Sequence, residues 1–222
     1  MFAQNQNDYK TTIMNEKYAI GVDIGGSHIA CQIMELNSCT PVAETYTEVK
    51  IAESESAQKI LSAWDNALSE CMQKAGARAI TGLGVAIPSP FDFIRGIAQA
   101  EHKFASIKGI NVRSELHRIT GIEPSNIRFT NDAAGFGMGA WSLGGEKARH
   151  LIGVTLGTGF GASFIVDGCY ATYGPGVPIG GELWDYPFRG RIAEDFVSTR
   201  WFEEEFHQIT GVPITGVKPM ID

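Results

Sequence analysis

Basic residues are in short supply in this sequence, which has 18 Lys and Arg residues against 25 Asp and Glu residues and a formal net charge of -7. A protein that binds nucleic acid needs clustered Lys and Arg side chains to neutralise phosphates. The composition therefore excludes nucleic acid as an expected partner.

Long apolar runs are also missing. Glycine or a charged residue interrupts every apolar stretch before it reaches the roughly 18 to 20 residues that a membrane span needs. The N-terminal residues are polar and unlike a signal peptide. We therefore expect no membrane partner, a cytoplasmic location and a flexible tail at residues 1–16.

Cysteine is scarce and scattered. The four cysteines, Cys31, Cys39, Cys71 and Cys169, form no CxxC motif and no Cys/His cluster. This spacing suits neither a disulfide framework nor a zinc site. We expect reduced, mostly buried thiols and no zinc.

What is present is a chain of 222 residues with 44% hydrophobic residues, enough for a packed core. Its first half shows a β-β-β-α-β pattern, because apolar runs with turn glycines precede a stretch with apolar residues at three- and four-residue steps. The predicted strands cover residues 18–24, 29–36, 42–49 and 80–87, and the predicted helix covers residues 56–74.

The second half repeats this theme, with strands expected at residues 150–156, 160–166 and 169–173. We predict an N-terminal lobe at residues 17–132 and an incomplete C-terminal lobe at residues 133–222. Helices are expected at residues 111–120, 133–143 and 192–209, with a strand at 127–129. Glycines 135, 137 and 139 weaken a helix, so close packing is expected there.

Two glycine-rich turns join pairs of predicted strands. The first contains Asp23, Gly25, Gly26 and Ser27. Glycines let backbone N–H groups approach phosphate oxygens, and an acidic neighbour can hold hydrated magnesium. A plain hairpin turn explains the same residues.

The second turn has the same construction, and its Thr158 adds a hydroxyl donor between Gly157 and Gly159. A Rossmann motif needs GxGxxG between a strand and a helix, whereas this turn has GxGxG between two strands. The P-loop pattern GxxxxGK[ST] is absent. Both common nucleotide-binding folds are therefore disfavoured.

Asn131 and Asp132 stand where a short strand meets a helix. Asp132 is either a helix cap or a general base that accepts a proton as a substrate hydroxyl attacks a γ-phosphate.

Several segments, taken in order, resemble the ROK family of sugar kinases and repressors, which has a two-lobed ribonuclease H-like (actin-like ATPase) α/β fold. They are GVDIGGSHIA, GLGVAIPSPFD, FTNDAAGFGMGAW, LGTGFGAS, GGELWDYP and RIAEDFVS. The similarity runs from about residue 18 to residue 208. It implies a cytoplasmic, homodimeric, glucokinase-like transferase that uses ATP and Mg²⁺ to phosphorylate a hexose or amino sugar.

The resemblance also implies roles for individual residues. Asp132 is the catalytic base, and Asp23 holds Mg²⁺ through water. The expected phosphate-binding residues are Gly25, Gly26, Ser27, Gly157, Thr158 and Gly159. The expected sugar-binding residues are Ser89, Asn131, Glu182, Asp185 and Glu194, with Ser89 either donating to a sugar oxygen or capping its loop.

Four departures from the family pattern stand out. Asp185 replaces a histidine that contacts sugar and zinc, and the Cys-rich zinc loop is missing, so no zinc is expected. His28 replaces a basic residue and is interpreted as a solvated or core histidine. Glu101 and His102 stand near the usual place of a sugar-facing asparagine. The chain ends before the family's adenosine-binding segment, which implies either a fragment or a loss of adenine recognition.

Three functions follow from these features. The first is an ATP-dependent sugar kinase. The second is a non-catalytic sugar-binding or regulatory relative, because Asp185 replaces a sugar-contacting residue and the chain ends before the family's adenosine-binding segment. The third is an acetate kinase-like or Hsp70-like ATPase, which does not explain Asn131 and Asp132 together with Glu182 and Glu194. Absence of an N-terminal helix-turn-helix region favours the kinase branch over the repressor branch.

Overall fold

The computed structural model describes residues 17–100, 104–144, 148–157 and 159–220. The chain divides into two compact units, one ending at Asp132 and the other starting at Ala133.

The first unit is built on one mixed sheet, with strand order β3-β2-β1-β5-β8 and with β4 also paired to β2. Strand β1 runs antiparallel to β2 and parallel to β5, and β5 runs parallel to β8. The strands are β1 (Tyr18–Gly25), β2 (His28–Glu35), β3 (Thr40–Pro41), β4 (Thr47–Lys50), β5 (Ile80–Ala86) and β8 (Ile127–Thr130). Because three strands are parallel, their carboxyl ends meet at one edge of the sheet.

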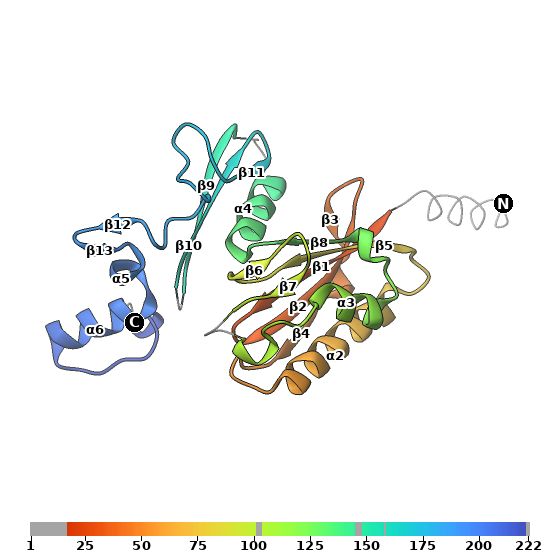
Figure 1. The fold of residues 1–222 in the computed structure, drawn as a ribbon, viewed down its shortest axis with the longest axis horizontal. Helices are drawn as coiled ribbons and strands as arrows, with labels where there is room; N and C mark the ends of the chain where they lie inside the picture. Colours follow the sequence, from red (N-terminus) through yellow and green to blue (C-terminus); the bar gives the residue numbers. More distant parts are fainter. Residues whose placement is uncertain (1–16, 101–103, 145–147, 158, 221–222) are drawn as a thin grey trace. The chain divides into compact units, whose positions relative to one another are not determined.

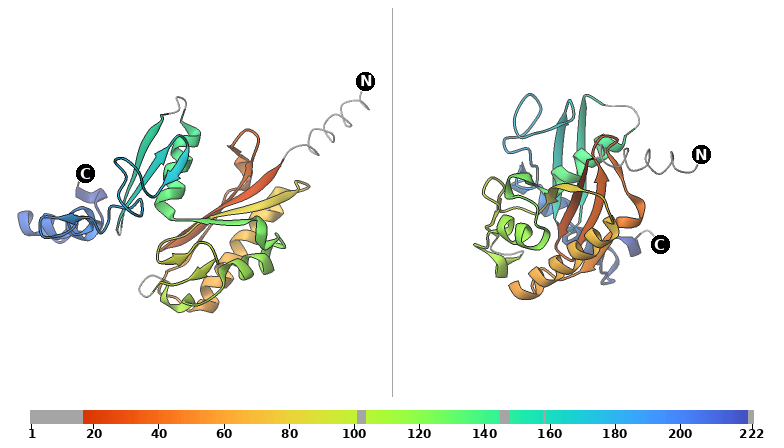
Figure 2. Two further views of the ribbon diagram at one scale, coloured as in Figure 1. Left: turned by 45° about the horizontal axis from the view of Figure 1, so that its top comes forward. Right: turned by 90° about the vertical axis from the view of Figure 1, so that its right-hand side faces the viewer.

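Two helices cover one face of this sheet, as Figures 1 and 2 show: α2 (Ala57–Ala75) and α3 (Val112–Thr120). Ser56 caps α2 by accepting the Lys59 N–H, and Asn111 caps α3. The buried face of α2 packs against β2 and β4, and it shares one hydrophobic core with alternate β1 residues such as Ile20, Val22 and Ile24. Both predicted helices are confirmed to within one residue at each end.

The predicted strand at residues 42–49 is confirmed only in its second half, as β4, because a 3₁₀ turn, η1 (Ala43–Thr45), occupies most of the first half. The buried hydroxyl of Thr45 donates to the Val42 carbonyl at 2.6 Å and accepts the Ile33 N–H at 3.0 Å. A side chain thus takes the place of a backbone partner for β2, and the chain turns before β4 begins.

A small hairpin and two 3₁₀ turns complete the first unit. Strands β6 (Phe91–Asp92) and β7 (Ile97–Ala98) form the hairpin, which follows the Pro88-Ser89-Pro90 segment. The 3₁₀ turns are η2 (Ala105–Ile107) and η3 (Pro124–Asn126).

The second unit contains a three-stranded antiparallel sheet of order β11-β10-β9. Its elements are α4 (Asp132–Leu143), β9 (His150–Leu156), β10 (Phe160–Val166) and β11 (Cys169–Ala171). Helix α4 approaches β10 closely, because a Cβ on Gly137 would collide with the Ser163 side chain. Close packing is therefore confirmed at Gly137, whereas a Cβ on Gly139 would meet nothing within 4 Å.

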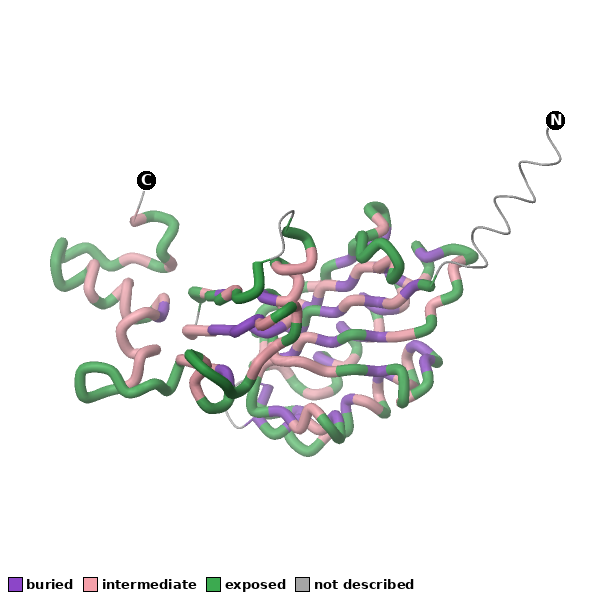
Figure 3. The backbone as a smooth tube through the Cα atoms, turned by 90° about the horizontal axis from the view of Figure 1, so that it is seen from above, coloured by how far each residue is buried: buried purple, intermediate pink, exposed green. Residues whose placement is uncertain are grey.

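The predicted helix at residues 192–209 is two helices, α5 (Glu194–Val197) and α6 (Thr199–Thr210). Ser198 between them is extended, and its buried hydroxyl caps α6 by accepting the Trp201 N–H. No residue of α6 is buried, and Figure 3, in which buried residues are purple, shows little purple near the C-terminus. The unpredicted elements here are β12 (Pro187–Phe188), β13 (Arg191–Ile192) and η4 (Lys218–Met220).

All four cysteines are free thiols. Cys31 and Cys71 are buried, but Cys39 and Cys169 are exposed, so the prediction of mostly buried thiols is wrong for half of them. Across the described residues, none of the helices combines the length and the apolar character needed to cross a membrane.

Candidate functional site

The carboxyl ends of three parallel strands carry the candidate residues of the first unit. Asp23 lies near the end of β1, Ser89 follows β5, and Asn131 and Asp132 follow β8. The Ile87 N–H donates to the Thr130 carbonyl at 3.0 Å and extends the β5–β8 pairing to this edge. Ligands of α/β sheets commonly bind at such an edge.

Ser89 and Asn131 are in direct contact. The Asn131 Nδ2 group donates to the Ser89 hydroxyl at 3.3 Å. Ser89 is therefore a hydrogen-bond acceptor for Asn131, a role that the sequence did not predict. Its hydroxyl proton stays available to a further acceptor.

Asp23 lies beside His28 and within the electrostatic influence of Asp132. Partial desolvation raises the pKa of Asp23 although its side chain is 56% exposed, and the negative charge of Asp132 raises it further, while His28 opposes both effects. The His28 Nε2 atom is 3.7 Å from the Asp23 carboxylate. Two mutually repelling carboxylates suit a hydrated Mg²⁺ ion, which binds through one or two carboxylates together with substrate phosphates.

Two side chains cover the glycines of the first turn. The His28 imidazole lies over Gly25, and the Glu53 carboxylate lies 2.5 Å from where a Cβ on Gly26 would stand. The Glu53 N–H also donates to the Gly26 carbonyl at 2.9 Å. Glu53 was missed from the sequence, because nothing in the polar segment after β4 marks it as a neighbour of the turn.

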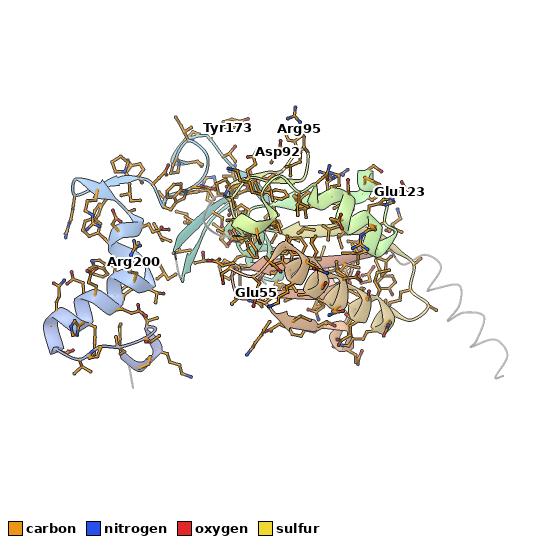
Figure 4. All side chains as sticks on the ribbon, turned by 60° about the horizontal axis from the view of Figure 1, so that its bottom comes forward. Glu55, Asp92, Arg95, Glu123, Tyr173 and Arg200 are labelled. Atoms are coloured by element: carbon orange, nitrogen blue, oxygen red, sulfur yellow. The ribbon has the colours of Figure 1, made fainter. Side chains whose placement is uncertain are left out.

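Arg113 on α3 was also missed, and it fixes the hairpin that follows Ser89. Its guanidinium donates to the carbonyls of Ile94, at 2.9 Å, and Pro124, at 3.0 Å, and lies over the Phe129 ring of β8. Figure 4 labels Asp92 and Arg95 on this hairpin, where Asp92 Oδ1 accepts the Arg95 N–H. The turn of this hairpin and β8 thus contact the same Arg113 side chain.

The second glycine turn joins β9 to β10 in the second unit. Glu194 Oε2 accepts the Phe160 N–H at 2.9 Å and lies 2.6 Å from where a Cβ on Gly159 would stand. The Gly157 N–H donates to the Gly159 carbonyl, which closes the turn. Glu194 therefore lies against the expected phosphate turn.

The segment that carries Glu182 and Asp185 is anchored beside Glu194. The Glu194 N–H donates to the Trp184 carbonyl at 3.0 Å, and Trp184 Nε1 donates to the Glu182 carboxylate at 2.6 Å. Burial raises the pKa of Tyr170, and the Glu182 charge adds to this effect. Asp185 is exposed. The second unit thus places all three acidic candidates on one connected segment.

Three of the sequence candidates, Thr158, Glu101 and His102, lie outside the described residues. Within the part of the chain that the structure describes, no three His, Cys, Asp or Glu side chains converge to hold a metal ion.

The fold and the strand-end site define a two-unit α/β protein of the actin-like ATPase fold. The ROK family model matches residues 19–179. The chain therefore belongs to the ROK family. No curated protein matches it by sequence.

Solved structures of ROK proteins share its fold. The ROK hexokinase from Thermus thermophilus has a TM-score of 0.66 and 22% identity, over 89% of this chain and 66% of that one. A ROK family glucokinase from Streptomyces griseus, in complex with glucose and AMPPNP, has a TM-score of 0.62 and 18% identity, over 87% of this chain and 62% of that one.

A ROK family transcriptional regulator, a homologue of the E. coli MLC protein, is equally similar in fold. Its TM-score is 0.66 at 15% identity, over 89% of this chain and 51% of the regulator. The chain spans 51% to 66% of the length of these three proteins.

Proposed function

We propose that this chain carries the catalytic core of an ATP-dependent sugar kinase that phosphorylates a hydroxyl of a hexose or an amino sugar. The observation that supports this most directly is the gathering of Asp23, Ser89, Asn131 and Asp132 at the carboxyl ends of β1, β5 and β8. The hexokinase and the glucokinase of similar fold agree with it.

In the proposed reaction, Asp132 accepts the proton of the attacking sugar hydroxyl. Asp132 is an exposed residue, and its negative charge raises the pKa of Asp23. Asn131 and Ser89 orient the sugar as a hydrogen-bonded pair. No covalent nucleophile is needed, because positioning and charge stabilisation carry most of phosphoryl transfer.

Mg²⁺ would enter with ATP as part of the substrate and would bind near Asp23 through water. A cation there relieves the repulsion between Asp23 and Asp132 that raises the pKa of Asp23. The glycines of the two turns would meet the phosphates, and Glu182, Asp185 and Glu194 would meet sugar hydroxyls.

Domain limits of residues 17–132 and 133–222, a homodimer and a cytoplasmic location belong to the same proposal.

A coupled ADP-release assay tests the proposal. The wild-type chain, Asp132→Asn and the control Asp65→Asn on α2 are each given MgATP and a panel of hexoses and N-acetylhexosamines. We expect sugar-dependent ADP release in the wild type and the control, and a loss of at least about a hundredfold in Asp132→Asn. ADP release that ignores sugar, or that survives in Asp132→Asn, contradicts the proposed mechanism.

A non-catalytic sugar-binding or regulatory role is the second candidate, and the similar fold of the transcriptional regulator favours it. Sugar binding detected by calorimetry without ADP release would support this role over the kinase.

A further inference from the structure

The second glycine turn is held on both sides by one short segment of the chain. On the N–H side, Glu194 Oε2 accepts the Phe160 N–H at 2.9 Å. On the carbonyl side, Thr199 makes two bonds to the Gly157 carbonyl, from its N–H at 2.9 Å and from its hydroxyl at 2.7 Å. Glu194 begins α5 and Thr199 begins α6.

The turn and this segment fit each other closely. A Cβ on Gly159 would stand 2.6 Å from the Glu194 carboxylate, so a larger residue there would push the Glu194 side chain away from the turn. The Ser198 break places Thr199 at the start of α6, where its N–H has no partner within the helix and can turn to Gly157. Gly159 thus leaves room for Glu194 on one side of the turn, and the Ser198 break brings Thr199 to Gly157 on the other.

The first unit shows a similar arrangement at its own turn. The Glu53 and Ile51 N–H groups donate to the carbonyls of Gly26 and Ser27, and the Glu53 carboxylate lies against Gly26. Each glycine turn therefore has a neighbouring segment that donates hydrogen bonds to carbonyls of the turn and brings a glutamate carboxylate into contact with one of its glycines.

We infer that Thr199, acting with Glu194, is a positioning residue that holds the second glycine turn in the shape that receives ATP phosphates. The inference rests on the proposed function, which puts phosphates at this turn. Thr199 acts through the Gly157 carbonyl and does not itself touch the nucleotide.

Two variants and a matched control test this inference in the full chain. Thr199→Val removes the hydroxyl donor at nearly constant volume, and Thr199→Ser restores it. The control is Thr210→Val, because the Thr210 hydroxyl, also on α6, donates to the Phe206 carbonyl at the same distance of 2.7 Å. Circular dichroism checks that each variant keeps its fold.

The first readout is NMR hydrogen exchange at the Phe160 amide, which requires no ligand. We expect about fivefold faster exchange in Thr199→Val, on the scale of one lost hydrogen bond, and wild-type exchange in Thr199→Ser and Thr210→Val. Equal exchange in Thr199→Val and Thr210→Val would show that the Thr199 hydroxyl does not hold the turn and would overturn the inference.

The second readout is the Kd of magnesium AMPPNP by calorimetry. We expect about fivefold weaker binding in Thr199→Val, rescue in Thr199→Ser, and no change in sugar Kd. Faster exchange with an unchanged nucleotide Kd overturns the functional role of Thr199. No binding of magnesium AMPPNP to the wild type contradicts the proposed nucleotide function, while the exchange data still decide whether Thr199 holds the second glycine turn.

Discussion

The Asn131 amide donates a hydrogen bond to the Ser89 hydroxyl at 3.3 Å, although the two residues are 42 positions apart in the chain. The contact exists because β5 and β8 run parallel and end together, so that the segments after them leave the sheet side by side. The residue pair thus couples the Pro88-Ser89-Pro90 loop to the start of α4.

Removing the Ser89 hydroxyl should weaken sugar binding. In Ser89→Ala the Asn131 amide loses an acceptor and its orientation is less well defined, so we expect the sugar KM to rise about three- to tenfold with a smaller change in kcat. Steady-state kinetics with varied sugar measures this. Ser69→Ala on α2, which also removes a side-chain hydrogen bond, is the control, and equal KM values in the two variants would contradict the role of Ser89.

Stability should depend on pH through Asp23. Its pKa is raised in the folded chain, chiefly by partial desolvation of its 56% exposed side chain and also by the Asp132 charge. Folding therefore favours the protonated form of Asp23. The contribution of Asp23 to the free energy of unfolding is fully present below its ordinary pKa and is lost as pH rises through its raised pKa in the folded chain. Asp23→Asn removes the charge and should raise Tm relative to the wild type at neutral pH, but not in acid. A Tm difference that stays constant across the pH range would refute the assignment.

Trp64 should be the most costly single truncation in α2. Its side chain is fully buried, and replacement by Ala leaves a cavity that costs about 3–5 kcal/mol. Its Nε1 group has no hydrogen-bond partner among the described residues, so Trp64→Phe removes an unsatisfied donor and should cost less than Trp64→Ala. Urea unfolding followed by circular dichroism gives both values, and the opposite order would show that the ring is not packed as described.

Thiol labelling should separate the cysteines into two pairs. Burial raises the pKa of Cys31 to about 12 and of Cys71 to about 11, so neither forms the reactive thiolate in the native state at pH 8. Cys39 and Cys169 are exposed and should react with iodoacetamide. Mass spectrometry of native and urea-unfolded protein counts two and then four labels, and native labelling of Cys31 or Cys71 would contradict the buried positions.

Local patterns in the sequence were sufficient for most of the elements. Apolar spacing identified α2, and glycine turns between apolar runs identified the β1–β2 and β9–β10 hairpins, because these features depend on neighbours a few residues away. The order of motifs also identified the ROK family, which the family model confirms.

Only the tertiary structure decided where the expected elements break and which side chains meet the glycine turns. Thr45 interrupts the predicted third strand because it bonds to Ile33 on a neighbouring strand. Glu53 reaches Gly26 and Glu194 reaches Phe160 across long stretches of sequence. These contacts follow from how the strands and segments pack. Side-chain hydrogen bonds between residues distant in sequence leave no periodic signal, and so the sequence alone did not predict them.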